Sequence, residues 1–122
     1  MTTAFLANQR GATAVEFALL LPAFASLLVG MMYLSILGFT FVDLHNAVET
    51  AARCAAVQTT ACTSAAKIQA AASAAFVGLG VTPTFTYTAA SCGHQVTGVA
   101  AFSLNTGLKA ISVPITSTAC YP

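Results

Sequence analysis

The residue types that could carry chemistry in this sequence are its cysteines, its two histidines and its three acidic residues. Cys92 and His94 lie two positions apart, so a thiol and an imidazole occur together in one short segment. A cysteine acts as a nucleophile only as a free thiolate, and the imidazole that activates it needs an acidic group to orient it. No Asp or Glu follows Glu49 in the sequence. We therefore predict that Cys92 is disulfide-bonded in a turn and that the chain is not an enzyme.

The four cysteines are typical of a protein that folds in an oxidising compartment, because an even number in a short chain usually forms disulfides. They are Cys54, Cys62, Cys92 and Cys120. More than one pairing is open to them, and we favour Cys54–Cys62 and Cys92–Cys120 because each pair stays within one structural unit. Carboxylates are scarce and no Cys-x-x-Cys pair occurs, so we expect no metal site and no cofactor.

The element that precedes these cysteines is a long apolar stretch. No charged residue occurs from Phe17 to Val42, and only 6% of the 122 residues are charged, against about 25% in ordinary soluble domains. As a helix this stretch would be about 39 Å long, which is enough to cross a hydrocarbon core of about 30 Å. The rest of the chain is too small to bury such a helix. We therefore predict a transmembrane helix over Phe17–Val42.

The charges on either side of this stretch predict its orientation. Arg10 precedes it, whereas Asp43 and Glu49 are the first charged residues after it. Because positive flanks stay in the cytoplasm, the N-terminus is expected to be cytoplasmic and the residues from Leu44 onward to lie outside, where cysteines can oxidise. The net charge is +1 without any run of Lys or Arg, so the chain lacks the basic patch of a nucleic-acid-binding protein.

The periodicity of the remaining residues predicts an α+β fold. The long helix should continue to residue 57, because apolar residues recur at i, i+3 and i+4 spacing. Ser64 is a suitable N-cap for a second short helix over residues 65–77. The period then changes to two. We expect a small three-stranded antiparallel sheet, packed on the second helix, with strands over residues 81–89, 95–104 and 108–116 and a hairpin loop at 105–107.

The motif that indicates a function is RGATAVEFALLLP, residues 10–22. Gly11 follows a positive charge, Glu16 stands five residues later, and an uninterrupted apolar segment comes next. This motif resembles the type IV pilin superfamily, in which a prepilin peptidase cuts after the glycine and leaves a glutamate as the fifth mature residue. The resemblance implies cleavage between Gly11 and Ala12, with the apolar helix retained. It divides the chain into a leader (1–11), a long pilin-like helix (12–57) and an α+β head (58–122).

Glu16 has a physical role that can be argued from its charge. A carboxylate at the edge of a membrane helix is costly, and such residues are usually paired or functional. After cleavage, the positive α-amine of Ala12 would lie one helical turn away, and a helix N-terminus also favours a nearby negative charge. We hypothesise that Glu16 pairs with this amine, in its own subunit or in a neighbour during assembly. The alternative is that Glu16 only reaches the lipid headgroups.

Within the superfamily, the sequence resembles TadE-like proteins of the tight-adherence (Tad) pilus system. The resemblance covers residues 11–57 and rests on the motif above, the apolar helix and the segment NAVETAARCAAV. It implies a minor pseudopilin, an assembly subunit of a Tad-type (type IVb/c) pilus used in adhesion or biofilm formation. It further implies a bacterial inner-membrane location with a periplasmic C-terminus, and incorporation into an extracellular pilus. The implied partners are prepilin peptidase and other pilin and pseudopilin subunits, with no small-molecule substrate.

Two other interpretations of the N-terminal region stay open. The chain could be a permanently anchored envelope protein that binds a periplasmic partner, in which case its leader would remain intact. Ordinary signal peptidase could also cut before Ser26, because Ala23-Phe24-Ala25 is a small-x-small triplet. Glu16 inside the supposed signal segment, and the strongly apolar residues that would follow the cut, argue against this second interpretation.

Overall fold

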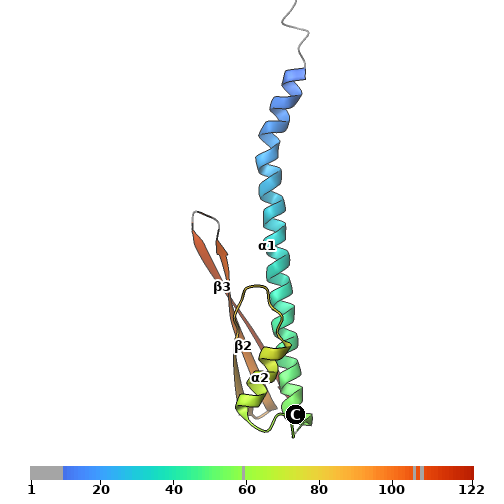
Figure 1. Ribbon diagram of the computed structural model, residues 1–122, viewed down its shortest axis with the longest axis vertical. Coiled ribbons are helices and arrows are strands. Elements are labelled where there is room, and N and C mark those ends of the chain that lie inside the picture. Colours follow the sequence, from blue (N-terminus) through green and yellow to red (C-terminus); the bar gives the residue numbers. More distant parts are fainter. Residues whose placement is uncertain (1–9, 59, 106, 108) are drawn as a thin grey trace, which may run out of the picture. The chain divides into compact units, whose positions relative to one another are not determined.

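The computed structural model describes residues 10–58, 60–105, 107 and 109–122, without the side chains of Arg10 and Ala12. Its elements in chain order are α1 (Arg10–Val57), α2 (Ala65–Ala75), β1 (Thr84–Ala90), β2 (Gly93–Asn105) and β3 (Ala110–Tyr121) (Figure 1). A long helix, a short helix and a three-stranded antiparallel sheet confirm the predicted α+β class. The chain forms two compact units, which divide between Leu34 and Ser35.

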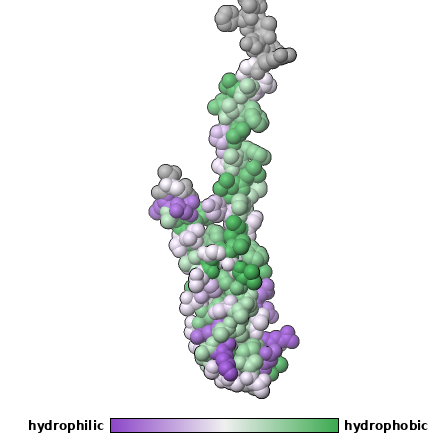
Figure 2. Space-filling view, viewed as in Figure 1, coloured by the Kyte–Doolittle hydropathy of each residue, from purple (hydrophilic) through white to green (hydrophobic). Residues whose placement is uncertain are grey.

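The first unit consists, in the described residues, of the N-terminal part of α1. Its sequence is rich in Ala, Leu and Met, which have high helix propensity. Pro22 lies inside the helix, where it lacks the N–H that would donate to the preceding turn. Large apolar side chains are exposed all along this segment, and Leu19 for example is 75% exposed. Figure 2 shows the resulting hydrophobic surface.

The second unit, Ser35–Pro122, combines the predicted head with the C-terminal part of α1, and the word head means this whole unit from here on. Both helices and the sheet contribute to its hydrophobic core. The buried side chains are Thr40, Leu44, Ala47, Val48, Ala51, Ala52 and Ala55 of α1, Cys62 before α2, Ile68 and Ala72 of α2, and Phe85, Val96, Ala100, Phe102, Ile115 and Ser117 of the sheet. The α1 residues among them repeat at helical spacing and form one stripe, as the sequence predicts. Many are alanines, so the backbone of α1 can approach the sheet closely.

The sheet has the order β1-β2-β3, with both neighbouring pairs antiparallel. Gly98 in the middle of β2 is the point of close approach to α1. A Cβ atom at this position would lie 2.9 Å from side-chain atoms of Leu44, Val48 and Phe85. On the α2 side, the Phe76 and Phe85 rings meet edge to face with centroids 6.4 Å apart. This edge-to-face contact joins the end of α2 to β1.

Two differences from the predicted bounds are explained by where backbone N–H groups find, or lack, a hydrogen-bond partner. The helix α2 ends at Ala75 rather than at residue 77, because Phe76 takes an extended conformation and its N–H closes the last turn on the Ala72 carbonyl. The next N–H, that of Val77, donates instead to Asp43 Oδ2 at 2.7 Å. The strand β1 begins at Thr84 rather than at residue 81, directly after Pro83, which has no N–H to give to a sheet.

The β2–β3 hairpin is longer than predicted. β3 continues to Tyr121 rather than ending at residue 116, and β2 begins at Gly93 instead of residue 95. Sequence periodicity misses the end of β3 because its inward residues there are small or polar, so the hydrophobic alternation fades. In the turn, Asn105 Oδ1 accepts a hydrogen bond from Gly107 N at 3.0 Å. Gly107 has φ +79°, a conformation that glycine adopts without steric cost.

Candidate functional site

The N-terminal turns of α1 contain the residues of the predicted processing site. The structure places Gly11, Ala12 and Glu16 within one continuous helix that begins at Arg10. Gly11 and Glu16 are exposed, and nothing lies within 4 Å of the position of a Cβ atom at Gly11. Residues 1–9 of the predicted leader lie outside the described residues. Ala12 and Glu16 are four positions apart on a helix, which puts them on the same face, one turn from each other.

The apolar surface of α1 continues from this turn to the end of the first unit. In the described part of the chain, Thr13–Val57 is the one helix that is long and apolar enough to cross a membrane, and its most apolar stretch has a mean hydropathy of 2.1. No residue of this most apolar stretch is buried within the protein. In water, an apolar surface of this extent would be an aggregation site. The helix therefore indicates single-pass membrane anchoring.

The predicted span from Phe17 to Val42 is not uniform in its surroundings. Phe17 and Val42 are both exposed, but Leu37 packs against the core of the second unit and Thr40 is 0% exposed. The Thr40 hydroxyl donates to the Ile36 carbonyl at 2.8 Å, so its burial leaves no polar atom unpaired. The last turns of the apolar stretch thus belong to the head on one face. Composition alone did not reveal this, although Leu37 and Thr40 continue the helical spacing of the core stripe.

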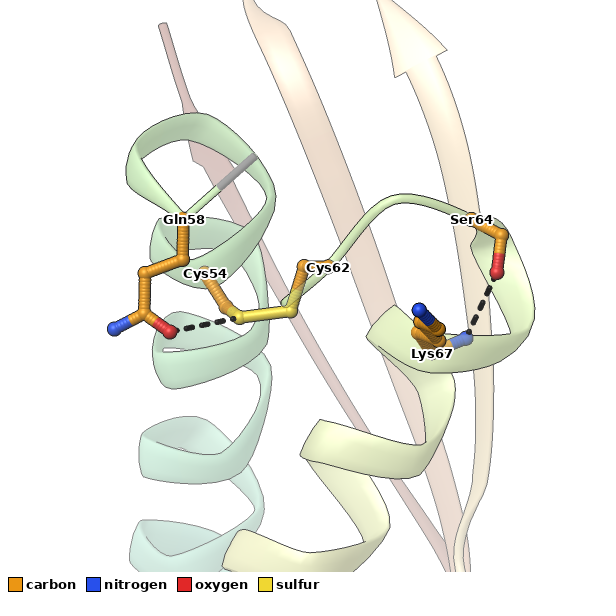
Figure 3. The surroundings of a disulfide bond; sticks show 5 residues. All are labelled: Cys54, Gln58, Cys62, Ser64 and Lys67. Atoms are coloured by element: carbon orange, nitrogen blue, oxygen red, sulfur yellow. Dashed lines mark hydrogen bonds between the residues drawn. A yellow bond between two sulfur atoms is a disulfide. The ribbon is translucent and has the colours of Figure 1, made fainter. Parts of the chain in front are cut away.

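The disulfide between Cys54 and Cys62 joins the last turn of α1 to the segment before α2 (Figure 3). The turn between them is held by backbone hydrogen bonds from Gln58 N to the Cys54 carbonyl and from Cys62 N to the Gln58 carbonyl, each 2.9 Å long. Gln58 Oε1 also contacts Cys54 Sγ at 3.6 Å, although a disulfide sulfur carries no hydrogen to donate. Directly afterwards, Ser64 Oγ accepts a hydrogen bond from Lys67 N, so Ser64 is the N-cap of α2, as predicted.

The second disulfide, Cys92–Cys120, joins the β1–β2 turn to the end of β3. Cys92 is therefore not a thiolate, and none of the described cysteines is free. His94 Nδ1 lies 2.8 Å from the Tyr87 hydroxyl, and the two rings are stacked. Both members of the apparent thiol–imidazole pair thus have structural partners. Both disulfides have the pairing favoured by the sequence argument.

Two further polar contacts connect α1 to the rest of the head. His45 Nδ1 lies 3.0 Å from the hydroxyl of Ser117 on β3, and Asp43 accepts the Val77 N–H at the end of α2. Neither role is visible in the sequence, because both contacts depend on segments that are distant in the chain. Within the described residues, no group of three or more His, Cys, Asp or Glu side chains could hold a metal ion.

A groove of about 670 Å³ lies between α1 and α2. Its lining residues are Thr50, Arg53, Cys54, Val57, Gln58, Ala71, Ala74 and Ala75. Arg53 is the only charged residue among them, and the lining contains no nucleophile paired with a base. The groove was not predicted from the sequence, since it forms between two helices whose packing depends on the tertiary fold. The groove is therefore described as a depression in the surface and not as a catalytic site.

Comparison with known families gives one result. Residues 11–53 match the model of a family described as TadE-like protein. Comparisons with curated proteins and with solved structures give no match. The matched segment begins at Gly11 and ends at Arg53, so it contains Glu16 and the apolar helix, whereas α2 and the sheet lie outside it. Over residues 11–53, the match confirms the TadE-like resemblance seen in the sequence.

Proposed function

We propose that this protein is a minor pseudopilin, an assembly subunit of a Tad-type pilus, and that it is processed by a prepilin peptidase after Gly11. The observation that carries the proposal is that Gly11, Glu16 and the exposed apolar helix lie in order on one continuous α1, within the segment that matches the TadE-like family. The disulfide-bonded head then provides the part of the subunit that lies outside the membrane.

Processing creates the charge pair on which assembly depends. Cleavage of the peptide bond between Gly11 and Ala12 leaves a positive α-amine on Ala12, one helical turn from the Glu16 carboxylate. In the membrane, pairing of the two groups lowers the cost of holding either charge near hydrocarbon. During assembly Glu16 exchanges its own amine for that of an adjacent subunit. Because the pair forms at one height along the helix, this exchange sets the axial register between subunits.

The location follows from charge and redox chemistry. We place α1 in the bacterial inner membrane with its N-terminus in the cytoplasm, where prepilin peptidase would meet the leader. Arg10 stays on the cytoplasmic side according to the positive-inside rule. The head lies in the periplasm, an oxidising compartment in which its two disulfides persist. Its further partners are other pilin and pseudopilin subunits of the Tad machinery, and the assembled pilus serves adhesion or biofilm formation.

N-terminal sequencing of the membrane-extracted protein tests the proposal. The full chain is expressed with and without a prepilin peptidase, and we expect a start at Ala12 only when the peptidase is present. Gly11→Val should block the cut, whereas Gly30→Ala, a glycine change further along the same helix, should leave it unaffected. An intact leader in the presence of active peptidase would contradict the proposal and favour a permanently anchored protein. A start at Ser26 would instead show cleavage by ordinary signal peptidase.

A further inference from the structure

The groove between α1 and α2 lies entirely within the second unit, to which all of its lining residues belong. Its α1 side is one face of the helix, on which Thr50 and Arg53 are three positions apart. Its α2 side consists of three alanines on one face of that helix, Ala71, Ala74 and Ala75. Because alanine side chains are short, the two helices leave a space of about 670 Å³ between them.

The groove contains a positive charge that the head does not neutralise. Arg53 is exposed, and its side chain makes no ion pair or hydrogen bond within the described residues. Glu49 lies four positions before it, at a spacing that favours a pair, but the two side chains do not pair in the structure. No Asp or Glu follows Glu49 in the sequence, and the Asp43 carboxylate already accepts the Val77 N–H. The head therefore has no other acidic side chain to offer Arg53.

A second positive charge lies at one end of the groove. Lys67 is four positions before Ala71 on α2, so the two residues are on the same face of this helix. Lys67 is exposed, and its ammonium group pairs with no acidic side chain in the described part of the chain. Figure 3 shows Lys67 on the first turn of α2, across the Cys54–Cys62 disulfide from Gln58, which lines the groove. Two cations thus lie beside one groove without an anion of their own.

These residue types fit a carboxylate that belongs to another polypeptide. The planar guanidinium of an arginine binds both oxygens of a carboxylate by parallel hydrogen bonds, and the Lys67 ammonium adds a second attractive charge. The Thr50 hydroxyl and the Gln58 amide can donate to backbone carbonyls, while the alanines let a backbone come close. A volume of about 670 Å³ is in the range of sites that enclose a whole ligand, about 300–1,000 Å³. A single small anion would leave most of this space empty, whereas a peptide segment of a few residues fills it.

We propose that this groove is a docking site for a segment of a different pilin-type subunit, in which a carboxylate is flanked by small residues. The Arg53 guanidinium holds the carboxylate, Lys67 strengthens the attraction at one end, and the alanines of α2 contact the flanking residues. The Cys54–Cys62 disulfide ties α2 to α1, so the site is formed before the partner arrives. A second copy is a poor occupant, because its α2 and sheet contain no acidic residue and its Asp43 is already bound. The pilin-type identity of the partner rests on the proposed function, whereas the recognition of a carboxylate does not.

Short peptides test the site on the full chain in zwitterionic detergent micelles. The acidic peptide is acetyl-Ala-Ala-Glu-Ala-Ala-amide, and the matched neutral peptide has Gln in place of Glu. A third peptide, acetyl-Ala-Ala-Ala with a free C-terminal carboxylate, presents the same group at a chain end. Alanine methyl signals, followed by nuclear magnetic resonance as each peptide is added, report binding and its position. We expect saturable shifts at Ala71, Ala74 and Ala75 with the acidic peptides and none with the neutral one. The tighter of the two acidic peptides shows whether the carboxylate comes from a side chain or from a chain end.

Two pairs of variants separate charge from shape. Arg53→Gln should weaken binding of the acidic peptide about tenfold or more, the effect of losing one charge-assisted hydrogen-bonded pair. Lys109→Gln, which changes a positive residue outside the lining, should leave the affinity unchanged. Ala74→Leu keeps every charge but fills the groove, so it should abolish binding. Ala66→Leu, the same change at an exposed position of α2 outside the lining, should have no effect. Circular dichroism spectra that match the native chain show that each variant is folded.

The remaining outcomes overturn the proposal. Equal binding of the acidic and neutral peptides, or binding that Arg53→Gln leaves intact, would show that the groove does not recognise a carboxylate. Stronger binding of glucuronic acid than of either acidic peptide would assign the groove to an acidic polysaccharide. Shifts of the same alanines with rising concentration of the chain itself would identify the occupant as a second copy. The peptides are added to the purified chain, so their failure to bind would leave the expected start at Ala12 unaffected. An intact leader would equally leave the groove result unaffected.

Discussion

At the scale of single residues, the chain contains residues whose role is local and residues whose role depends on contact with a distant segment. The sequence alone shows Gly11 and Glu16, five positions apart, directly before the apolar segment. It also shows the hydroxyl of Ser64 that caps α2. The partners of Asp43 and His45 were not predictable, because each lies far away in the sequence. The same holds for Gly98, whose lack of a side chain matters only because α1 crosses the sheet at that point.

The first prediction concerns Glu16. Glu16→Gln keeps the size of the side chain but removes the charge that would pair with the Ala12 amine. We expect normal membrane insertion and a strong decrease in the amount of subunit found in sheared pili, measured by immunoblotting against the cell-associated protein. Glu49→Gln, an exposed change outside the anchor, should leave incorporation unchanged. If Glu16→Gln subunits were processed and incorporated like the native chain, the register role would be wrong.

The second prediction compares two glycines. Gly98→Ala places a Cβ atom 2.9 Å from the side chains of Leu44, Val48 and Phe85, so the core must move. We expect a loss of about 1–3 kcal/mol in the free energy of unfolding, the usual cost of overpacking. Gly38→Ala meets nothing within 4 Å on α1 and should be neutral or stabilising by up to about 1 kcal/mol, because alanine is the better helix former. Urea unfolding in detergent, followed by near-ultraviolet circular dichroism, measures both. A destabilised Gly38→Ala with an unchanged Gly98→Ala would contradict this packing.

At the scale of elements, periodicity predicted which elements exist more reliably than where they end. The change of period after Gly80 indicated the sheet, because the alternating apolar side chains of β1 face a core. The end of β3 was missed because Ser117 and Ala119 give little hydrophobic signal, although Ser117 is buried beside His45. The predicted end of α2 lies two residues too late, because the Asp43 carboxylate accepts the Val77 N–H and no local pattern shows this contact.

The third prediction concerns the two disulfides. They close loops of different length, with sequence separations of 8 and 28 residues. In the chain-entropy description, removing the shorter one should cost about 2.6 kcal/mol and removing the longer one about 3.6 kcal/mol. Paired serine variants, Cys54→Ser with Cys62→Ser and Cys92→Ser with Cys120→Ser, provide the comparison under urea unfolding. If the first pair proved the more costly to lose, the stabilisation would not follow loop closure.

At the scale of the whole molecule, one helix serves two environments. The sequence predicted a single span from Phe17 to Val42, because no charge interrupts it. In the structure, the last turns of this stretch also contribute Leu37 and Thr40 to the head. Composition cannot separate these roles, since a residue that faces lipid and a residue that faces a protein core are equally apolar. The family match does not resolve them either, because it covers both as one segment.

The fourth prediction tests this division of α1. A chain that starts at Ser35 keeps every buried residue of the head, whereas a chain that starts at Asp43 lacks Leu37 and Thr40 but keeps the Asp43 carboxylate that accepts the Val77 N–H. Produced under oxidising conditions in mild detergent, the first should remain folded, with dispersed amide signals in nuclear magnetic resonance spectra. The second should be less stable by about 2–4 kcal/mol, in the range found when large core side chains are removed. Equal stability of the two chains would show that the apolar stretch contributes nothing to the head.

The position of the last cysteine sets an order on how the mature protein can be made. Cys54 and Cys62 are separated by 8 positions, whereas Cys120 comes much later in the sequence than either of them and 28 positions after its partner Cys92. If the head is exported as proposed, the inner pair can therefore oxidise while the later residues are still crossing the translocon. The outer pair, Cys92–Cys120, closes only after Cys120, near the end of β3, has emerged. A cell that accepted only fully oxidised subunits for filament growth would thereby exclude chains whose translocation was interrupted.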